Sequence, residues 1–168
     1  MLRTKASSRG MTLIELLITV AVLSIALSLA APSMSKQVAN YRVRGAAESI
    51  LGGLSLARTE AVRRNSAVSF TLTAGTSAWT VAQVSPATTI QSRPGGENLG
   101  VTTASGNSAW TLSFNPTGMV NTSSTWLSRV TVSSAVAGTD SRQIDILSGG
   151  LIRSCDPAVT TTSDPRKC

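Results

Sequence analysis

One long apolar run near the N-terminus constrains this chain more than any other feature. The run begins at Leu13 and reaches Ala31, and its only charged residue is Glu15. At about 1.5 Å per residue, a helix of this length measures about 28 Å, which is enough to cross the apolar core of a bilayer. A carboxylate at the edge of such a core is costly unless it has a partner. The sequence therefore predicts a membrane helix in which Glu15 either has a partner outside this chain or lies at the membrane surface.

The residues that flank the run predict its orientation in the membrane, but they do not decide whether the run is cleaved off. Arg3, Lys5 and Arg9 precede it, and basic residues on this side favour a cytoplasmic N-terminus with the rest of the chain outside. The stretch ALSLAAPSM contains the small residues of a conventional signal-peptidase site near Ala31. On these residues alone, a cleaved signal peptide and a plain signal anchor both remain open.

Composition argues against catalysis. The chain contains no histidine, which removes the usual general base and the commonest metal ligand. No phosphate-binding loop, nucleophile–base pair or carboxylate cluster is apparent in the sequence. We therefore expect no enzyme activity, no metal and no cofactor.

The two cysteines favour a structural role. Cys155 and Cys168 lie near the C-terminal end of a chain of 168 residues. Two cysteines without histidine cannot form a metal site unless carboxylates help. A disulfide is the better interpretation, and it requires an oxidising compartment such as the periplasm.

The net charge is less informative than it first looks. The formal charge is +7, but three of the 15 basic residues lie in the first ten positions, so 12 basic and 8 acidic side chains remain after them. This moderate excess favours an ordinary solvated surface over an anionic partner.

A second helical pattern follows Pro32. Apolar residues recur at spacings of three, four and six, which predicts an amphipathic helix. The predicted apolar stripe comprises Val38, Tyr41, Ala47, Ile50, Leu51, Leu54, Ala57 and Ala61. We expect Pro32 to kink the helix rather than end it, so that one long helix results.

The same pattern also predicts where this helix ends and where it is weak. Arg63 and Arg64 lie where cations favour a helix C-terminus, and Asn65 can end the helix in a left-handed conformation. The pair Gly52-Gly53 should weaken the helix by about 1 kcal/mol per glycine. Arg58, Glu60 and Arg63 are best interpreted as charges that pair along the helix or cap it.

From Ser66 the apolar period changes to two, which is typical of strands, and the abundance of Ser, Thr and Val agrees with it. The predicted elements are a hairpin in SAVSFTLTAGTSAWTVAQV, a strand running into a turn in SAWTLSFNPTGMV, and strands in SRVTVSS, RQIDIL and LIRSC. SRPGGENLG is predicted as a loop by its Pro and Gly content. DPAVTTTSDPRKC is a loop whose ends a disulfide would join, worth about 3 kcal/mol in the chain-entropy description.

The N-terminal stretch RGMTLIELLITVAVLSIALSLAAP resembles the N-terminus of type IV pilins and type II secretion pseudopilins. The resemblance covers a short basic leader ending in Gly10, then Met11, Thr12 and Glu15, with Pro32 where many pilins have a helix-kinking proline. Met11 departs from the phenylalanine that is most usual there.

This resemblance implies three properties. A prepilin peptidase would cleave between Gly10 and Met11 and methylate the new amine of Met11. The apolar helix would hold the subunit in the inner membrane until assembly. Glu15 would then neutralise the N-terminal amine of a neighbouring subunit, which supplies the missing partner.

The soluble part resembles the GspH/FimT family of minor pilins. SLARTEAVRRNSAVSF is similar to the end of that family's helix and its first strand, FNPTGMV to its F-x-P-x-G turn, and SGGLIRSCDPAV with SDPRKC to its last hairpin and tail. In this comparison Phe114 is expected in the core and Gly118 in the turn. Residues 75–112 match nothing in the family's pattern.

The tail carries a degraded form of one functional motif. Some FimT-type pilins bind DNA and carry G-R-x-R before the first tail cysteine, where this chain has Gly150, Leu151, Ile152 and Arg153. Arg153, together with Arg166 and Lys167, could meet phosphates. The first motif arginine is missing and no aromatic residue is near for stacking, so DNA binding is an alternative that the sequence disfavours.

Together these features predict an α+β type IV pilin fold, with a long N-terminal helix on a mostly antiparallel sheet and a disulfide-tied C-terminal tail. The expected organisation is a leader at 1–10, a transmembrane half-helix at 11–34, an amphipathic half-helix at 35–65 and a β-rich periplasmic domain at 66–168.

The resemblance implies a structural minor pilin near the tip of a type IV pilus, where it primes or supports fibre assembly. Its partners would be the prepilin peptidase, other minor pilins or pseudopilins, the major pilin and the inner membrane. A GspH-like pseudopilin of a type II secretion system and a DNA receptor are the alternatives.

Overall fold

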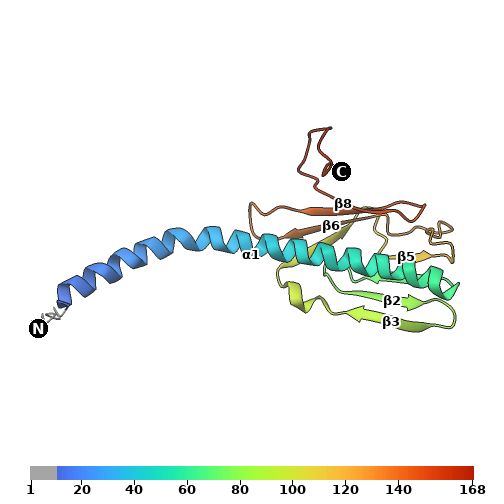
Figure 1. The fold of residues 1–168 in the computed structure, drawn as a ribbon, viewed down its shortest axis with the longest axis horizontal. Helices are drawn as coiled ribbons and strands as arrows, with labels where there is room; N and C mark the ends of the chain where they lie inside the picture. The colour runs from blue at the N-terminus through green and yellow to red at the C-terminus, as the bar shows by residue number, and fades with distance from the viewer. Residues whose placement is uncertain (1–10) are drawn as a thin grey trace, which may run out of the picture. The chain divides into compact units, whose positions relative to one another are not determined.

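The computed structural model describes residues 11–168, and it describes their side chains except at 29–32 and 97–98. The chain divides into two compact units, residues 1–35 and 36–168. One helix, α1 (Leu13–Arg64), contributes to both units (Figure 1). Each unit is described by itself below.

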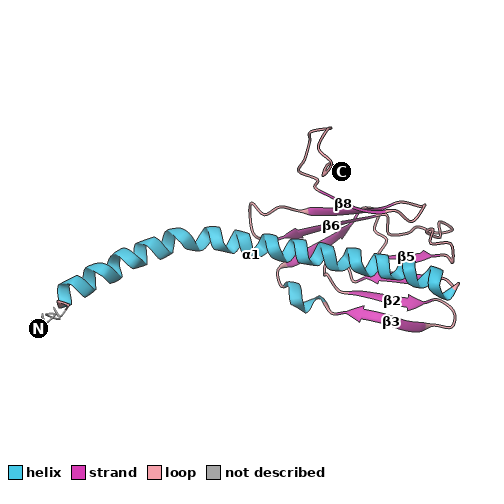
Figure 2. Cartoon of the chain, in the orientation of Figure 1, coloured by secondary structure: helices cyan, strands magenta, loops and turns pink. Residues whose placement is uncertain are grey.

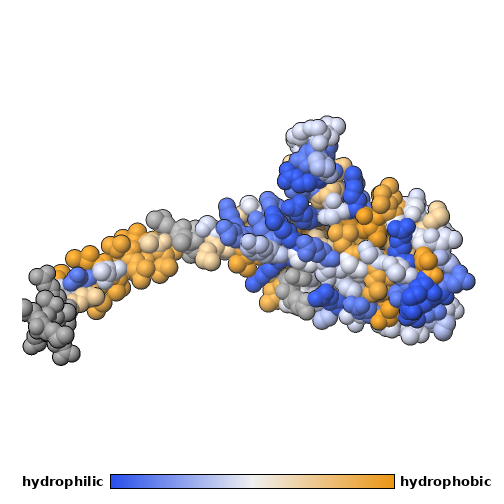
Figure 3. Space-filling model, viewed as in Figure 1, coloured by the Kyte–Doolittle hydropathy of each residue, from blue (hydrophilic) through white to orange (hydrophobic). Residues whose placement is uncertain are grey.

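The first unit is an apolar helix. The side chains of residues 11–28 are all exposed, and Figure 3 shows this segment as almost continuously hydrophobic. Its hydroxyl groups donate hydrogen bonds to the helix's own carbonyls, from Thr19 to Leu16 O (2.8 Å), Ser24 to Val20 O (2.7 Å) and Ser28 to Ile25 O (2.8 Å). These hydroxyls therefore need no water, as a lipid environment requires.

Among the described residues, α1 is the helix that is long and apolar enough to cross a membrane. Its helical assignment continues through Pro32 without a break. This agrees with the expectation that Pro32 does not end the helix, and the kink itself stays a prediction.

In the second unit, the C-terminal half of α1 packs on two four-stranded sheets in which every strand pairing is antiparallel (Figure 2). The strand orders are β3-β2-β1-β5 and β4-β6-β7-β8. The elements are β1 (Val68–Leu72), β2 (Trp79–Gln83), β3 (Thr88–Arg93), the short 3-10 helix η1 (Gly95–Asn98), β4 (Val101–Ser105), β5 (Thr111–Phe114), β6 (Arg129–Ser134), β7 (Arg142–Ile146) and β8 (Ile152–Cys155).

The period-two segments form strands where the sequence predicts them. β1 and β2 form the predicted hairpin, in register with Leu72 opposite Trp79, and the predicted strands at β5, β6, β7 and β8 are present. The expected loop SRPGGENLG begins inside β3 and continues into η1. β3 and β4 lie in the stretch for which no element was expected.

The core of the second unit joins α1 to both sheets. Phe70, Leu72 and Val81 come from one sheet, while Val130 and Ile144 come from the other, and all are almost completely buried. Phe114 is also fully buried, as expected. A single apolar core therefore holds the helix and the two sheets together.

The predicted apolar stripe of α1 is right along its C-terminal part and wrong at its start. Val38 and Tyr41 are exposed, at 43% and 69%, whereas Val43 is buried. Tyr41 and Ala47 are six residues apart, which is about 600° of rotation and so places them on different faces. The buried helix residues instead follow one another at spacings of three or four: Ala39, Val43, Ala46 or Ala47, Ile50, Gly53 or Leu54, Ala57 and Ala61.

The two adjacent glycines of α1 have different roles. A Cβ on Gly53 would lie 2.8–2.9 Å from ring carbons of Phe70 and Trp79, whereas a Cβ on Gly52 would meet nothing within 4 Å. The Trp79 ring cannot easily move, because it stacks on Phe70 and donates a hydrogen bond from Nε1 to Ser49 Oγ (3.0 Å). Gly53 is therefore the position that lets the helix approach the sheet, while Gly52 only weakens the helix.

We expect Gly53→Ala to destabilise the globular unit and Gly52→Ala to stabilise it. Overpacking at Gly53 should cost about 1–3 kcal/mol, only partly offset by better helix propensity, whereas Gly52→Ala should gain about 0.5–1 kcal/mol. Urea unfolding of both variants measures the two changes against the wild type. Equal effects of the two substitutions would contradict the packing argument.

Candidate assembly sites and C-terminal tail

The start of α1 is capped by a side chain next to Met11. The backbone N–H of Glu15 donates a hydrogen bond to Thr12 Oγ1 (3.3 Å), and the N–H of Leu16 donates to Thr12 O (3.1 Å). Thr12 and Glu15 have the spacing of a capping box, in which the threonine serves one orphan N–H of the first turn. The sequence analysis missed this local role, although the T-x-x-E spacing was its signal.

The carboxylate of Glu15 lies in the first turn of α1. There its negative charge interacts favourably with the positive end of the helix dipole. No hydrogen bond or ion pair of the Glu15 side chain is found among residues 11–168. Met11 is exposed (67%), and Gly10, the other half of the predicted cleavage site, lies outside the described residues. The expected roles of Gly10, Met11 and Glu15 stay predictions.

The other end of α1 is held by an ion-pair cluster. Arg63 donates from Nε and Nη2 to the two carboxylate oxygens of Glu60 (3.0 and 2.7 Å), and Arg64 Nε donates to Glu60 Oε2 (2.6 Å). The hydrogen bonds from Arg63, and then those from Arg64, lower the pKa of Glu60 to about 2. Asn65 follows in the left-handed conformation (φ 48°), so the predicted helix end is confirmed.

We expect this cluster to give a pH-dependent contribution to stability. Because the pKa of Glu60 is lower in the folded state than its usual 4.5, the contribution is present above that value and is lost as the pH falls from 4.5 toward about 2. Urea titrations of the wild type and Glu60→Gln should differ at neutral pH and converge through this window. A difference that persists unchanged at the acid end would contradict the assignment.

Arg58 joins three segments that the family resemblance singled out separately. Its Nε donates to Gly118 O (3.1 Å), in the turn of FNPTGMV. Gly150, in the turn of SGGLIRSC, packs so closely that a Cβ there would collide with Gly118 O and come within 3.2 Å of Arg58 Nε. Both glycines have positive φ, 76° and 81°. The predicted turn role of Gly118 is confirmed, whereas Arg58 does not pair with Glu60.

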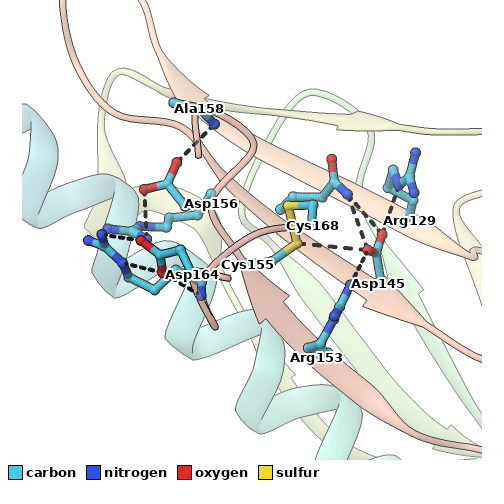
Figure 4. The surroundings of a disulfide bond; sticks show 11 residues. Arg129, Asp145, Arg153, Cys155, Asp156, Ala158, Asp164 and Cys168 are labelled. Atoms are coloured by element: carbon cyan, nitrogen blue, oxygen red, sulfur yellow. Dashed lines mark hydrogen bonds and ion pairs between the residues drawn. A yellow bond between two sulfur atoms is a disulfide. The ribbon is translucent and has the colours of Figure 1, made fainter. Parts of the chain in front are cut away.

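The tail is closed by the predicted disulfide. Cys155, at the end of β8, is bonded to Cys168, with a Cα–Cα distance of 5.1 Å (Figure 4). Next to it, the N–H of Asp156 donates to Arg166 O (2.7 Å), and the Asp156 carboxylate pairs with Arg142 (3.3 Å). The tail is therefore anchored where its two ends meet.

Replacing both cysteines by serine is expected to loosen the tail and the last hairpin and to leave the core folded. The loop is short, so its closure is worth about 3 kcal/mol. Cys155 is buried, but neither cysteine belongs to the apolar cluster that joins α1 to the two sheets. Amide hydrogen exchange should speed up in residues 156–168 and stay unchanged in β1 and β2. Loss of protection throughout the globular unit would contradict this expectation.

The three cations proposed for DNA binding do not form one free basic surface. Arg153 lies 3.7 Å from Asp145, which also accepts a hydrogen bond from Arg129 Nε (2.8 Å). Arg166 donates from Nε and Nη2 to Asp164 (3.1 and 2.7 Å). The hydrogen bonds from Arg166 lower the pKa of Asp164 to about 2.

Lys167 donates to Thr162 Oγ1 (3.4 Å). Figure 4 shows Arg153 directed toward Asp145, away from the pair formed at Asp164. Phosphates would have to compete with the carboxylates that pair with Arg153 and Arg166. DNA binding by these three residues stays a prediction, and the ion pairs weaken the case for it.

Arg166 also lines a groove between α1 and the end of the second sheet. The groove, of about 420 Å³, is lined by Arg44, Ala47, Glu48, Leu51, Arg142, Ser154 and Arg166. Its three arginines pair with Asp140 (3.9 Å), Asp156 (3.3 Å) and Asp164 (2.7 Å), and Glu48 adds a further negative charge. The groove is thus close to electrical balance and is no evident anion site. Among the described residues, no group of three or more metal-ligating side chains is found.

Two family models match the sequence of this chain. The prokaryotic N-terminal methylation motif matches residues 5–31. The family described as type II transport protein GspH matches residues 46–150, well over half of the chain. The chain belongs to the GspH family. The matched range contains Arg58, Gly118 and Gly150, so the junction that they form lies within the part common to the family.

Solved structures agree with this fold. Two crystal structures of the Pseudomonas aeruginosa (strain PAO1) type IV minor pilin FimU match, each at 18% identity. Their TM-scores are 0.56 and 0.52, and the matches cover 72% and 71% of this chain and 93% and 98% of FimU. Among proteins with curated functions, no sequence matches this chain.

These findings confirm the expected fold and class. This GspH-family chain has the type IV pilin fold, with a long N-terminal helix on antiparallel sheets and a C-terminal disulfide. Its N-terminal methylation motif and apolar helix fit a membrane-anchored, pilin-type subunit. Subunits of this kind interact with other pilins and with a prepilin peptidase.

Proposed function

We propose that this GspH-family protein is a structural minor pilin of a type IV pilus that assembles near the fibre tip and primes or supports fibre assembly. It has no catalytic role in this proposal, and the chemistry is done to it, by cleavage between Gly10 and Met11 and methylation of Met11. Before assembly, the subunit resides in the inner membrane with its N-terminus in the cytoplasm and its globular unit in the periplasm.

The observation that carries the proposal is the combination of one carboxylate and one amine at the start of α1. Glu15 is the only charge of the apolar run, and no partner for it is found within residues 11–168. A new amine at Met11 would give each subunit one positive charge to offer to the Glu15 of a neighbour. Inside a fibre both charges would be desolvated, so their pairing would define how far one helix is displaced along the next.

A second candidate is a minor pseudopilin of a type II secretion system, which the description of the GspH family favours. The same α1 and the same Glu15 pairing would serve in either fibre. The neighbouring subunits would then be pseudopilins, and the transported substrates would be secreted proteins.

Deletion of the gene distinguishes these candidates. We expect fewer surface pili, counted by electron microscopy, and normal release of secreted enzymes, with both restored by the wild-type gene. Normal pili together with a loss of secretion would overturn the pilus assignment in favour of the secretion system. Normal pili and normal secretion would contradict both candidates.

A further inference from the structure

The end of the globular unit at which α1 stops carries four large apolar side chains in water. Val62 is 53% exposed, Met119 49%, Leu147 48% and Leu151 57%. Figure 3 shows hydrophobic side chains interspersed with hydrophilic ones at this end of the globular unit. With Arg58 these four residues are called the α1-end patch below.

Contacts within the unit bring these residues together from three segments. Gly118, beside Met119, packs on Arg58 and Val62, where a Cβ would be 3.2 Å from each. The N–H of Leu147 donates to Leu151 O (2.9 Å), and the N–H of Val120 donates to Ser148 O (2.9 Å). The patch is therefore built on the same junction as the two positive-φ glycines.

A shallow hollow of about 390 Å³ lies beside the patch, lined by Arg58, Thr59, Val62 and Arg63. It is large enough to receive a side chain of a partner. Exposed apolar side chains gathered next to a hollow are typical of protein interfaces rather than of an ordinary solvated surface.

The positive charge of Arg58 indicates which chemical group a partner would place against the patch. Arg58 uses one N–H for Gly118 O, and among the described side chains no carboxylate pairs with it. Glu60, the nearest acid along α1, is occupied by Arg63 and Arg64. An arginine with spare donors beside apolar side chains is complementary to a carboxylate flanked by apolar groups.

Leu151 argues for a protein rather than a nucleic acid. It stands where G-R-x-R would place its first arginine, so the exposed residue of this turn is apolar instead of cationic. The cations that follow, Arg153 and Arg166, already have carboxylate partners. The α1-end patch itself is therefore apolar apart from Arg58, whose guanidinium has no carboxylate partner among the described residues.

We propose that the α1-end patch docks the globular domain of a neighbouring pilin-type subunit, which places a carboxylate against Arg58 and apolar side chains against Val62, Met119, Leu147 and Leu151. This inference rests on the proposed function. Residues 36–64 of α1 span about 42 Å, so the patch lies at the end of the globular unit opposite to the one where α1 enters. A contact between this patch and a different surface of the next subunit is a heterologous interface, the type that can extend into a fibre.

Photo-crosslinking in cells tests the contact. A photoreactive amino acid is placed at Leu151 or Met119 of the full-length chain, and at Leu99 as the control. Leu99 is even more exposed (69%), but it lies at the other end of the unit, where its carbonyl accepts a hydrogen bond from Arg42. We expect adducts with another pilin-type subunit from Leu151 and Met119 and none from Leu99.

Two charged variants test the chemistry of the partner. Leu151→Glu should lower recovery of the crosslinked pair from Met119 about tenfold, the effect of losing a moderate hot spot, because it sets a carboxylate against a carboxylate. Leu151→Lys should lower it less. Both variants should melt at the wild-type temperature because Leu151 is exposed.

The outcomes separate this inference from the proposed function. The chain is first sought in sheared fibres, and its absence from them would overturn both. If the chain is present in the fibres, three results would overturn the docking surface without contradicting the proposed function. These are equal crosslinking from Leu99 and Leu151, no adduct from the patch, and an adduct with nucleic acid only. A milder effect of Leu151→Glu than of Leu151→Lys would overturn the assignment of an acidic partner.

Discussion

Replacing Gly150 with alanine is expected to destabilise the globular unit by about 2–4 kcal/mol, because two costs add. Gly150 has φ 81°, a conformation that is strained for residues with a Cβ. The new methyl group would also collide with the carbonyl oxygen of Gly118, which is held by the hydrogen bond from Arg58. The backbone of one turn cannot move away without breaking its contact with α1.

Gly149→Ala is the matched control for this prediction. A Cβ at Gly149 meets nothing within 4 Å, and its φ is not positive. We expect this variant to be neutral or more stable by up to about 1 kcal/mol through the unfolded state. Chemical unfolding of residues 36–168 measures both variants, and equal stabilities would show that the contact between the two turns is not tight.

Glu15→Ala should abolish incorporation of the subunit into fibres while leaving its cleavage intact. Removing one partner of a desolvated charge pair costs about 3–5 kcal/mol, so the variant should fall by at least about a hundredfold in sheared fibres. Immunoblots of the sheared fraction and of the membrane fraction measure incorporation and cleavage in the same cells.

Two further variants separate the charge of Glu15 from its place in the helix. Glu15→Gln keeps the shape of the side chain and should be as defective as the alanine variant. Thr12→Ala removes the cap but keeps the carboxylate, and it should assemble much better. If Glu15→Gln assembles normally, charge pairing cannot be the reason that Glu15 is needed.

Strands were predictable where one face is buried and the other is not. β1 alternates buried Val68, Phe70 and Leu72 with less buried residues, and this alternation is visible in the sequence. β3 is almost entirely exposed, so its residues carry no apolar period and the strand could not be recognised. β3 exists because β2 supplies a partner, which is tertiary information.

The helix shows a different kind of error. Spacings of three and four predict one face correctly, as Ile50, Leu54, Ala57 and Ala61 confirm. A spacing of six does not, and accepting it placed Tyr41 wrongly in the core. The small residues Ala39 and Ala46 carry the buried face there, and alanine gives a weak signal because it occurs on any face of a helix.

The local part of the site was predictable and the long-range part was not. The pairing of Glu60 with Arg63 follows from residue spacing along one helix. The partner of Arg58 is a backbone oxygen 60 residues away, and the partner of Arg153 depends on the register of β7 and β8. Neither can be inferred without the pairing of the strands.

The mass of the mature chain, isolated from sheared surface fibres, tests the central claim most directly. The account predicts a polypeptide that begins at Met11, carries one added methyl group on its amine and contains the closed disulfide between Cys155 and Cys168. A chain that begins after Ala31, as a conventional signal peptide would leave it, or one that retains Gly10, would contradict the assignment as a pilin-type fibre subunit.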